Sequence, residues 1–326
     1  MNKIIRIFLL AVLLLSAGCQ RKPLMEPHEH YNLIIKAQID SLGRAQLMSN
    51  KSDYAALGTP ASTTYYLYDK GTGRVAYFGD FDGLEKRMYV EEGYYDLLLY
   101  TYDFNPLVDA NEVRGLGNPL TAETFTRQYL NSEDKSDEAV SDVTELYMVD
   151  PDPTFSAFHE DIVVLRHDED NIVQVDLVQK SFKYYLTIRA TGLQHIRTAT
   201  MHISGMYTTA FLAHEDHRMN EAGIQSIDMD IHQDTDPDPD IDNGYLYGEF
   251  WSFGPHQRED IINSITLQFV NGEVFMRQLD DLTDHIKTLD KGGEIIVNQI
   301  LEVTGPAGGF ELGVGNWNQT DVELIM

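Results

Sequence analysis

Apolar and polar residues alternate with a period of two along much of this chain. Between 184 and 190, Tyr184, Leu186, Ile188 and Ala190 alternate with Tyr185, Thr187 and Arg189. This period is typical of a strand with one buried face and one solvated face, as in an antiparallel sheet. The same period predicts strands over residues 31–40 (with Ile34 out of phase), 173–177, 199–203, 227–231 and 265–269.

Short turns separate several of these runs. Asn271-Gly272 lies between Phe269-Val270 and Glu273-Val274, and residues 69–73 contain two glycines between tyrosine-rich runs. Asn-Gly is a strong hairpin signal, and short connections favour antiparallel neighbours. The one helix candidate is 121–130, and amphipathic helices do not alternate with the strands. The pattern therefore predicts an all-β chain built from sandwiches of antiparallel strands.

The first residues have the layout of a secretory signal. Lys3 and Arg6 precede an apolar run over 7–15, which leads into small residues at 16–18 and then Cys19. The apolar run is shorter than the roughly 20 residues that a membrane-spanning helix needs. A signal peptide over 1–18 is therefore favoured over a permanent transmembrane anchor.

Cys19 is the only cysteine in the chain. The stretch from Leu15 to Cys19 resembles the lipobox of bacterial lipoproteins, although Ser16 occupies the place where an aliphatic residue is usual. The resemblance implies acylation of Cys19 after cleavage. The alternative is an ordinary cleaved signal with an unrelated cysteine nearby. In either case an exported chain with one cysteine forms no internal disulfide and depends on packing and hydrogen bonds.

The formal charge of −28 becomes −30 once the leader and its two basic residues are removed. Such a surface repels phosphate backbones, which excludes nucleic acid as a partner. It is compatible with simple solubility, with cations such as calcium, or with basic partners.

The length of the chain after the leader suggests two domains of about 150 residues each. Two polar stretches are candidate boundaries: His167 to Asn171 and, as an alternative, Asp150-Pro151-Asp152-Pro153. With the first boundary, the predicted organisation is a signal peptide at 1–18, a lipidated tether at 19–30, an N-terminal β-sandwich domain at 31–168 and a C-terminal β-sandwich domain at 169–326.

Longer runs in the second half resemble a known family. They span 184–193, 195–199 and 201–206, continue at Phe250-Trp251-Ser252-Phe253-Gly254-Pro255, and close between Gly308 and Trp317. Together with the lipobox, they are similar to the fimbrillin-like lipoproteins of Bacteroidales, in a branch related to the anchor subunit of the minor fimbrium. The resemblance extends diffusely from Cys19 to the C-terminus.

The resemblance implies two transthyretin-like β-sandwich domains, a lipid anchor in the outer membrane and a role in fimbrial attachment or adhesion without catalytic residues. Gln20-Arg21-Lys22 follow Cys19, where surface-exposed members often have acidic residues, so both faces of the outer membrane stay open. Because a stalk subunit of this family is trimmed after an arginine, Arg44, just past the first predicted strand, is a candidate processing site. The alternative is an ordinary exposed loop arginine.

A calcium loop is the best candidate for an ion site. Asp238, Asp240, Asp242 and Glu249 have the spacing of a calcium-binding loop. However, Asn243 stands where glycine is expected and Pro239 stiffens the loop, so a solvated hairpin loop is the competing interpretation.

Phe250, Trp251 and Trp317 are candidates for stacking on a ligand such as a sugar, although strand aromatics more often pack in a core. No nucleophile elbow, phosphate loop or dinucleotide fingerprint is present.

The sequence therefore predicts a non-catalytic outer-membrane lipoprotein that acts in fimbrium anchoring, assembly or adhesion. The alternative is a solitary surface lipoprotein that binds a glycan or a host protein.

Overall fold

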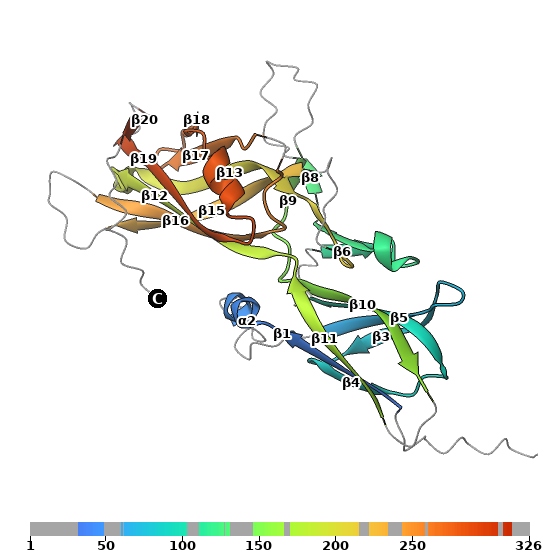
Figure 1. Ribbon diagram of the computed structural model, residues 1–326. Coiled ribbons are helices and arrows are strands. Elements are labelled where there is room, and N and C mark those ends of the chain that lie inside the picture. The colour runs from blue at the N-terminus through green and yellow to red at the C-terminus, as the bar shows by residue number, and fades with distance from the viewer. Residues whose placement is uncertain are drawn as a thin grey trace, which may run out of the picture.

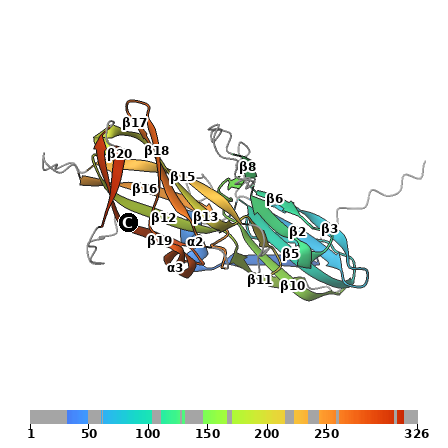
Figure 2. The ribbon, with the colours of Figure 1, turned by 90° about the horizontal axis from the view of Figure 1, so that it is seen from above.

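The computed structural model describes residues 32–48, 60, 62–102, 111–126, 128–130, 146–165, 170–214, 222–233, 243–257, 260–305 and 309–314. Nearly all of these residues lie in strands or in the turns between them, which confirms the all-β prediction. The strands form two lobes that lie end to end in an elongated molecule (Figures 1 and 2). In the described ranges no helix is long and apolar enough to cross a membrane.

The first lobe contains a seven-stranded sheet in the order β3-β2-β5-β10-β11-β1-β4. β10 and β11 pair only where Phe155–Ser156 meet Val178–Gln179, so the sheet folds back there into two layers. β1 lies in the middle of its layer, parallel to β11 and antiparallel to β4. The strand bounds are β1 Leu33–Ile39, β2 Ser62–Asp69, β3 Arg74–Phe81, β4 Glu85–Met88, β5 Gly93–Tyr102, β10 Phe155–Val164 and β11 Asn171–Gln179.

The core of the first lobe fills the space between these layers. Leu33 and Ile35 of β1 and Leu97 of β5 are fully buried in it. Leu33 and Ile35 belong to the alternating run predicted over 31–40, and burial of each such side chain contributes roughly 1.5–3 kcal/mol. The first strand is therefore a structural part of the lobe and not an appendage.

The second lobe contains a ten-stranded sheet whose main path is β18-β17-β13-β15-β16-β12-β19-β20, with β9 beside β15 and β8 beside β9. Its core lies between β13, β15 and β17 on one side and β12, β16 and β19 on the other. The strand bounds are β8 Gln128–Leu130, β9 Leu146–Met148, β12 Phe182–Thr191, β13 Ile196–Tyr207, β15 Ala222–Gln233, β16 Asn243–Ser252, β17 Asn263–Phe269, β18 Val274–Gln278, β19 Gly293–Gly305 and β20 Gly309–Val314.

The two lobes exchange chain segments. β9 comes from the first half of the sequence and pairs with β15 of the second lobe. In return, β14 (Thr209–Phe211) leaves the second lobe and joins a small sheet with β7 (Glu123–Thr126) and β6 (Asn111–Arg114). Leu212 then packs on the outer face of the first lobe with Tyr68 and Leu98. The lobes are thus interlocked as well as covalently joined.

The chain passes from the first lobe to the second at Lys180 and Ser181, between β11 and β12. β11, which the predicted boundary near 167–171 assigned to the C-terminal domain, pairs with β1 in the first lobe. The sequence could not reveal this because a parallel pairing across the whole first lobe leaves no local signal.

The predicted strands are found at β1, β11, β12, β13, β15 and β17, and the Asn271-Gly272 turn joins β17 to β18. The predicted helix at 121–130 is wrong. That region holds a single 3-10 turn at Pro119–Thr121, followed by β7 and β8. The β-branched Thr124 pairs with β6 and β14, and Thr126 pairs with β6 and donates its N–H to the carbonyl of Thr208, and this pairing outweighs the local preference.

A short helix that the sequence did not predict follows β1. This helix, α2 (Ser41–Met48), contains Gly43, a residue type that disfavours helix formation. A Cβ at this glycine would lie 2.7 Å from the ring of Phe155, so the glycine permits close packing of the helix on the lobe.

Candidate functional site

A cleft of about 860 Å³ lies where the two lobes meet. The first lobe contributes the ends of β1 and β11, and the second contributes the segment after β16 and the turn after α3 (Thr283–Thr288). A volume of this size is within the usual range for small-ligand sites, which occur preferentially between domains. Because the lobes are interlocked by β9 and β14, the cleft is preformed.

The first-lobe wall of the cleft is acidic. Asp40 and Asp176 line it with Gln38 and Gln179 beside them, and both carboxylates are exposed. Asp40 accepts a hydrogen bond of 2.6 Å from the backbone N–H of Gly43 and thereby caps α2. Gln38 Nε2 donates to Asp176 Oδ1 across the β1–β11 pair. These bonds hold two carboxylates at one edge of the cleft.

The second-lobe wall carries two lysines. Lys287 lies in the last turn of α3, where a cation is favoured by the helix dipole, and Lys291 follows in the next turn. Within the described residues, neither ammonium group lies within 4.0 Å of a carboxylate in an ion pair. Asp290 lies between them on the same wall. The two walls therefore differ in charge.

The floor of the cleft is apolar and rigid. Phe182 is half-buried, whereas Tyr207 and Phe253 are buried in a small cluster of their own. The Tyr207 ring packs on His256 with 4.8 Å between centroids. The backbone N–H of Tyr207 donates to the carbonyl of Gly254 over 2.9 Å. Only Phe182 thus presents part of a ring to an occupant.

A half-buried carboxyl group lies beside the connection between the lobes. Asp150 precedes the linker to β10, and its Oδ2 accepts a hydrogen bond of 3.2 Å from the backbone N–H of Trp251. Gln225 Nε2 donates to its other oxygen. Burial raises the pKa of Asp150 to about 7, against the lowering effect of the Trp251 hydrogen bond. This carboxyl titrates near neutrality and holds the linker against β16.

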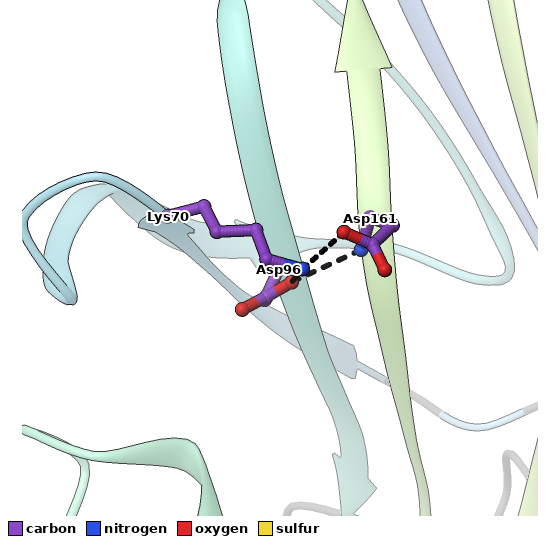
Figure 3. Close-up of polar contacts among 3 residues, drawn as sticks. All are labelled: Lys70, Asp96 and Asp161. Carbon is purple, nitrogen blue, oxygen red and sulfur yellow. Dashed lines mark hydrogen bonds and ion pairs between the residues drawn. The ribbon is translucent and has the colours of Figure 1, made fainter.

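Lys70, in the turn after β2, contacts aspartates of β5 and β10 (Figure 3). Its ammonium donates to Asp161 Oδ1 on β10 and lies 3.8 Å from Asp96 Oδ1 on β5. Asp161 has a positive φ of 63°, which aspartate tolerates, and its N–H donates to Asp96 over 3.0 Å. The hydrogen bond to Asp161 raises the pKa of Lys70. The amine is therefore charged and serves as a surface ion pair, not as a nucleophile.

Arg44 lies in α2 and not in the loop that the sequence suggested. Its side chain is exposed, but Nε donates to the carbonyl of Ile39 over 3.1 Å and its backbone N–H donates to Asp40. A protease needs an extended substrate, so cleavage here requires local unfolding of the helix.

The aromatic candidates on β16 do not face solvent. Phe250 is 1% exposed and stacks on Tyr184 in the core, and Trp251 is 7% exposed. Their rings are therefore closed to a sugar. Trp317 lies outside the described residues.

Glu249, the one proposed calcium ligand that is described, is ion-paired with Lys183 at 3.2 Å. Asp238, Asp240 and Asp242 lie outside the described residues, as does Cys19. In the described ranges no group of three or more His, Cys, Asp or Glu side chains is arranged to hold a metal ion.

The cleft has no signature in the sequence because its residues come from five distant segments of the chain. Gln38 and Lys291, which line opposite walls, come from opposite ends of the described chain. The one local hint is the run from Lys287 to Lys291, which is more basic than its surroundings.

No protein-family model matches the chain, and no curated protein is significantly similar to it. Among solved structures, a candidate adhesin from Bacteroides ovatus is 16% identical, with a TM-score of 0.53 over 89% of this chain and 98% of that chain. A candidate adhesin from Bacteroides thetaiotaomicron is 9% identical, with a TM-score of 0.52 over 86% and 93%. These similarities show a shared fold and agree with the family resemblance of the sequence.

The fimbrial anchor protein Mfa2 from Porphyromonas gingivalis also aligns, at 11% identity over 86% of this chain and 94% of that chain. Its TM-score is 0.43.

Proposed function

We propose that this protein is a non-catalytic adhesion or fimbrium component, attached to the outer membrane by acyl chains on Cys19, that keeps its own first strand. The observation that carries the proposal is the fold, which it shares with candidate adhesins over nearly their whole length. A fold alone does not fix a function, so the remaining support comes from the strands and edges of this chain.

The first strand is firmly held in the first lobe. β1 pairs with β11 along its whole length, from Leu33 to Ile39, and with β4 over Leu33–Lys36. Removing it would empty the centre of one layer and expose the opposite layer of the core. The candidate processing site at Arg44 lies within α2. These features favour a subunit that retains its first strand, as expected of an anchor, over one that is trimmed before polymerising.

A free sheet edge is available for a partner. In the described part of the chain β18 pairs only with β17, and Val274 and Met276 on its outer face are 59% and 54% exposed. β4, at one edge of the first lobe, is shorter and charged, with Lys86 over the Tyr65 ring. Charged, short edges resist pairing, and Val274 and Met276 make β18 the more apolar of these two edges, although Arg277 and Gln278 follow them. β18 is therefore the proposed strand-accepting edge.

Crosslinking in native cells tests this function. A photo-reactive residue placed at Met276, with a matched one at Lys86, is activated in cells, and the adducts are identified by mass spectrometry. The proposal predicts fimbrial subunits attached at position 276 and few adducts at position 86. Recovery of the acylated protein without any fimbrial subunit would contradict the fimbrial role.

The cleft favours a second candidate function, that of a solitary surface protein that binds a soluble ligand. The two functions differ in their partners, since the second requires no fimbrial subunit.

A further inference from the structure

The cleft combines three features that together restrict its ligand. Its first-lobe wall presents carboxylates and amides, its second-lobe wall presents lysine ammonium groups, and its floor presents part of one aromatic ring. Asp40 and Asp176 form the first wall, Lys287 and Lys291 the second, and Phe182 the floor. A ligand that fits all three features must carry hydroxyl groups, a negative charge and a flat apolar face.

We propose that the cleft binds an acidic glycan, a short oligosaccharide that carries carboxylate groups. Its hydroxyl groups are bound by the Asp and Gln wall and its carboxylates by the Lys wall. This inference rests on the proposed adhesive function, because it names what the protein adheres to.

The amide and carboxylate groups fit hydroxyl groups better than they fit a charged chain. A sugar hydroxyl both donates and accepts, a carboxylate only accepts, and an amide does both. Asp40 and Asp176 supply carboxylate oxygens that accept from ligand hydroxyls, and Gln38, whose Nε2 donates to Asp176, holds its amide beside them. Gln179 Nε2 donates to the carbonyl of Ser181. The C–H face of a sugar ring can pack on the exposed part of Phe182, as on other aromatic side chains.

The lysines select for an anion. The chain has 52 acidic and 24 basic residues, so most of its surface repels anions. In the cleft, Lys287 and Lys291 of the described chain form no ion pair with a carboxylate, and the lysines lining the cleft equal its aspartates in number. An ammonium–carboxylate hydrogen bond to a ligand is among the stronger polar contacts. An acidic sugar therefore has a favourable site in the cleft that the rest of the surface does not offer.

Calorimetric titration of the full-length acylated protein in detergent tests this proposal with three probes. Tetragalacturonate carries both hydroxyls and carboxylates, maltotetraose carries hydroxyls but no carboxylates, and tetraglutamate carries carboxylates but no hydroxyls. Tetragalacturonate is expected to bind, and each of the other two to bind about tenfold more weakly or worse, because each lacks one set of charge-assisted contacts.

A double variant, Lys287→Ala with Lys291→Ala, is expected to weaken tetragalacturonate binding about tenfold or more and to leave maltotetraose unchanged. The matching Lys→Arg pair keeps the charge and should retain binding. Lys36→Ala with Lys86→Ala, in the first lobe and outside the cleft, is the control. Equal thermal midpoints for the variants separate a lost contact from a lost fold.

Three results would overturn the proposal. They are no binding of tetragalacturonate, equal binding of tetraglutamate, or tetragalacturonate binding that survives loss of both lysines. Crosslinking at Met276, repeated on the same variants, separates this failure from failure of the proposed function. Fimbrial adducts without glycan binding would reject the ligand and leave the fimbrial role standing.

Discussion

Both lobes contain a parallel pair of strands, but the strands around that pair differ between the lobes. In each, a strand runs parallel to a later strand of the same lobe: β1 beside β11, and β12 beside β19. β12 also pairs with β16 along its whole length from Phe182 to Thr191, whereas β1 pairs with β4 over Leu33–Lys36 alone. The first lobe thus depends on a strand with less lateral support at the N-terminal end of the described chain, and the second lobe is built around a deeply embedded one.

This difference in lateral pairing bears on what the loss of each strand would do to its lobe. Loss of either strand would remove the centre of its lobe, but β1 lies at the N-terminal end of the described chain, whereas β12 lies between two described strands of the second lobe. Because β9 and β14 cross between the lobes, we expect damage to either lobe to reach the other.

The largest effect is expected from removing the first strand. Deletion of residues 31–40 removes Leu33, Ile35 and Ile39 from the core, and burial of each contributes roughly 1.5–3 kcal/mol. That sum approaches the whole stability of a typical domain, so the first lobe should unfold. Hydrogen exchange followed by mass spectrometry should show loss of protection in β11 and β4. Unchanged protection there would contradict the central role of β1.

A glycine in each lobe gives the next comparison. Gly192 has a φ of 70°, and a Cβ there would meet the carbonyl oxygen of Val303 at 2.0 Å. Gly73 has a φ of 67° with open space around it. Gly73→Ala should therefore cost about 1–2 kcal/mol from the backbone alone. Gly192→Ala should cost about 1–3 kcal/mol more, because the backbone of β19 must shift. Urea denaturation of both variants measures the difference in the free energy of unfolding. Equal losses would mean that the backbone of β19 shifts without cost.

The carboxyl at the junction of the lobes should make stability depend on pH. The pKa of Asp150 is about 7 in the folded protein, above the ordinary 3.8. The folded state therefore holds this proton more tightly than the unfolded state, and ionisation from pH 4 to pH 7 removes stability. Asp150→Asn should be more stable than the original above pH 7, with the gap closing toward pH 4. A gap that does not vary with pH would show that Asp150 does not titrate in this range.

The smallest expected effects on stability come from one lysine ion pair in each lobe. Lys183 is 3% exposed and paired with Glu249, whereas Lys70 is 40% exposed and paired with Asp161 and Asp96. Lys183→Ala should cost about 1–3 kcal/mol, because it removes the ion pair of a half-buried carboxylate. Lys70→Ala should leave the denaturation midpoint unchanged, because exposed pairs contribute little. A larger loss for Lys70 than for Lys183 would reverse this ranking.

The strands could be predicted from the sequence because alternation is a local property. Leu186 and Ile188 lie in the core as their spacing indicates, and Asn271-Gly272 makes the expected turn. Partner choice is not local, so the pairing of β1 with β11 and the exchange of β9 and β14 left no signal. The same limit applies to the candidate site. Phe250 and Trp251 stood out as aromatic residues but serve the core, whereas Lys287 and Asp176 became neighbours of one cleft only through the fold.

Intact-mass spectrometry of the protein purified from native membranes tests most directly whether it is an anchored subunit that keeps its first strand. We predict a mature chain that begins at an acylated Cys19 and still contains β1 and Arg44. A chain that begins at Ala45 would show that the first strand is removed and would contradict the proposed anchoring role.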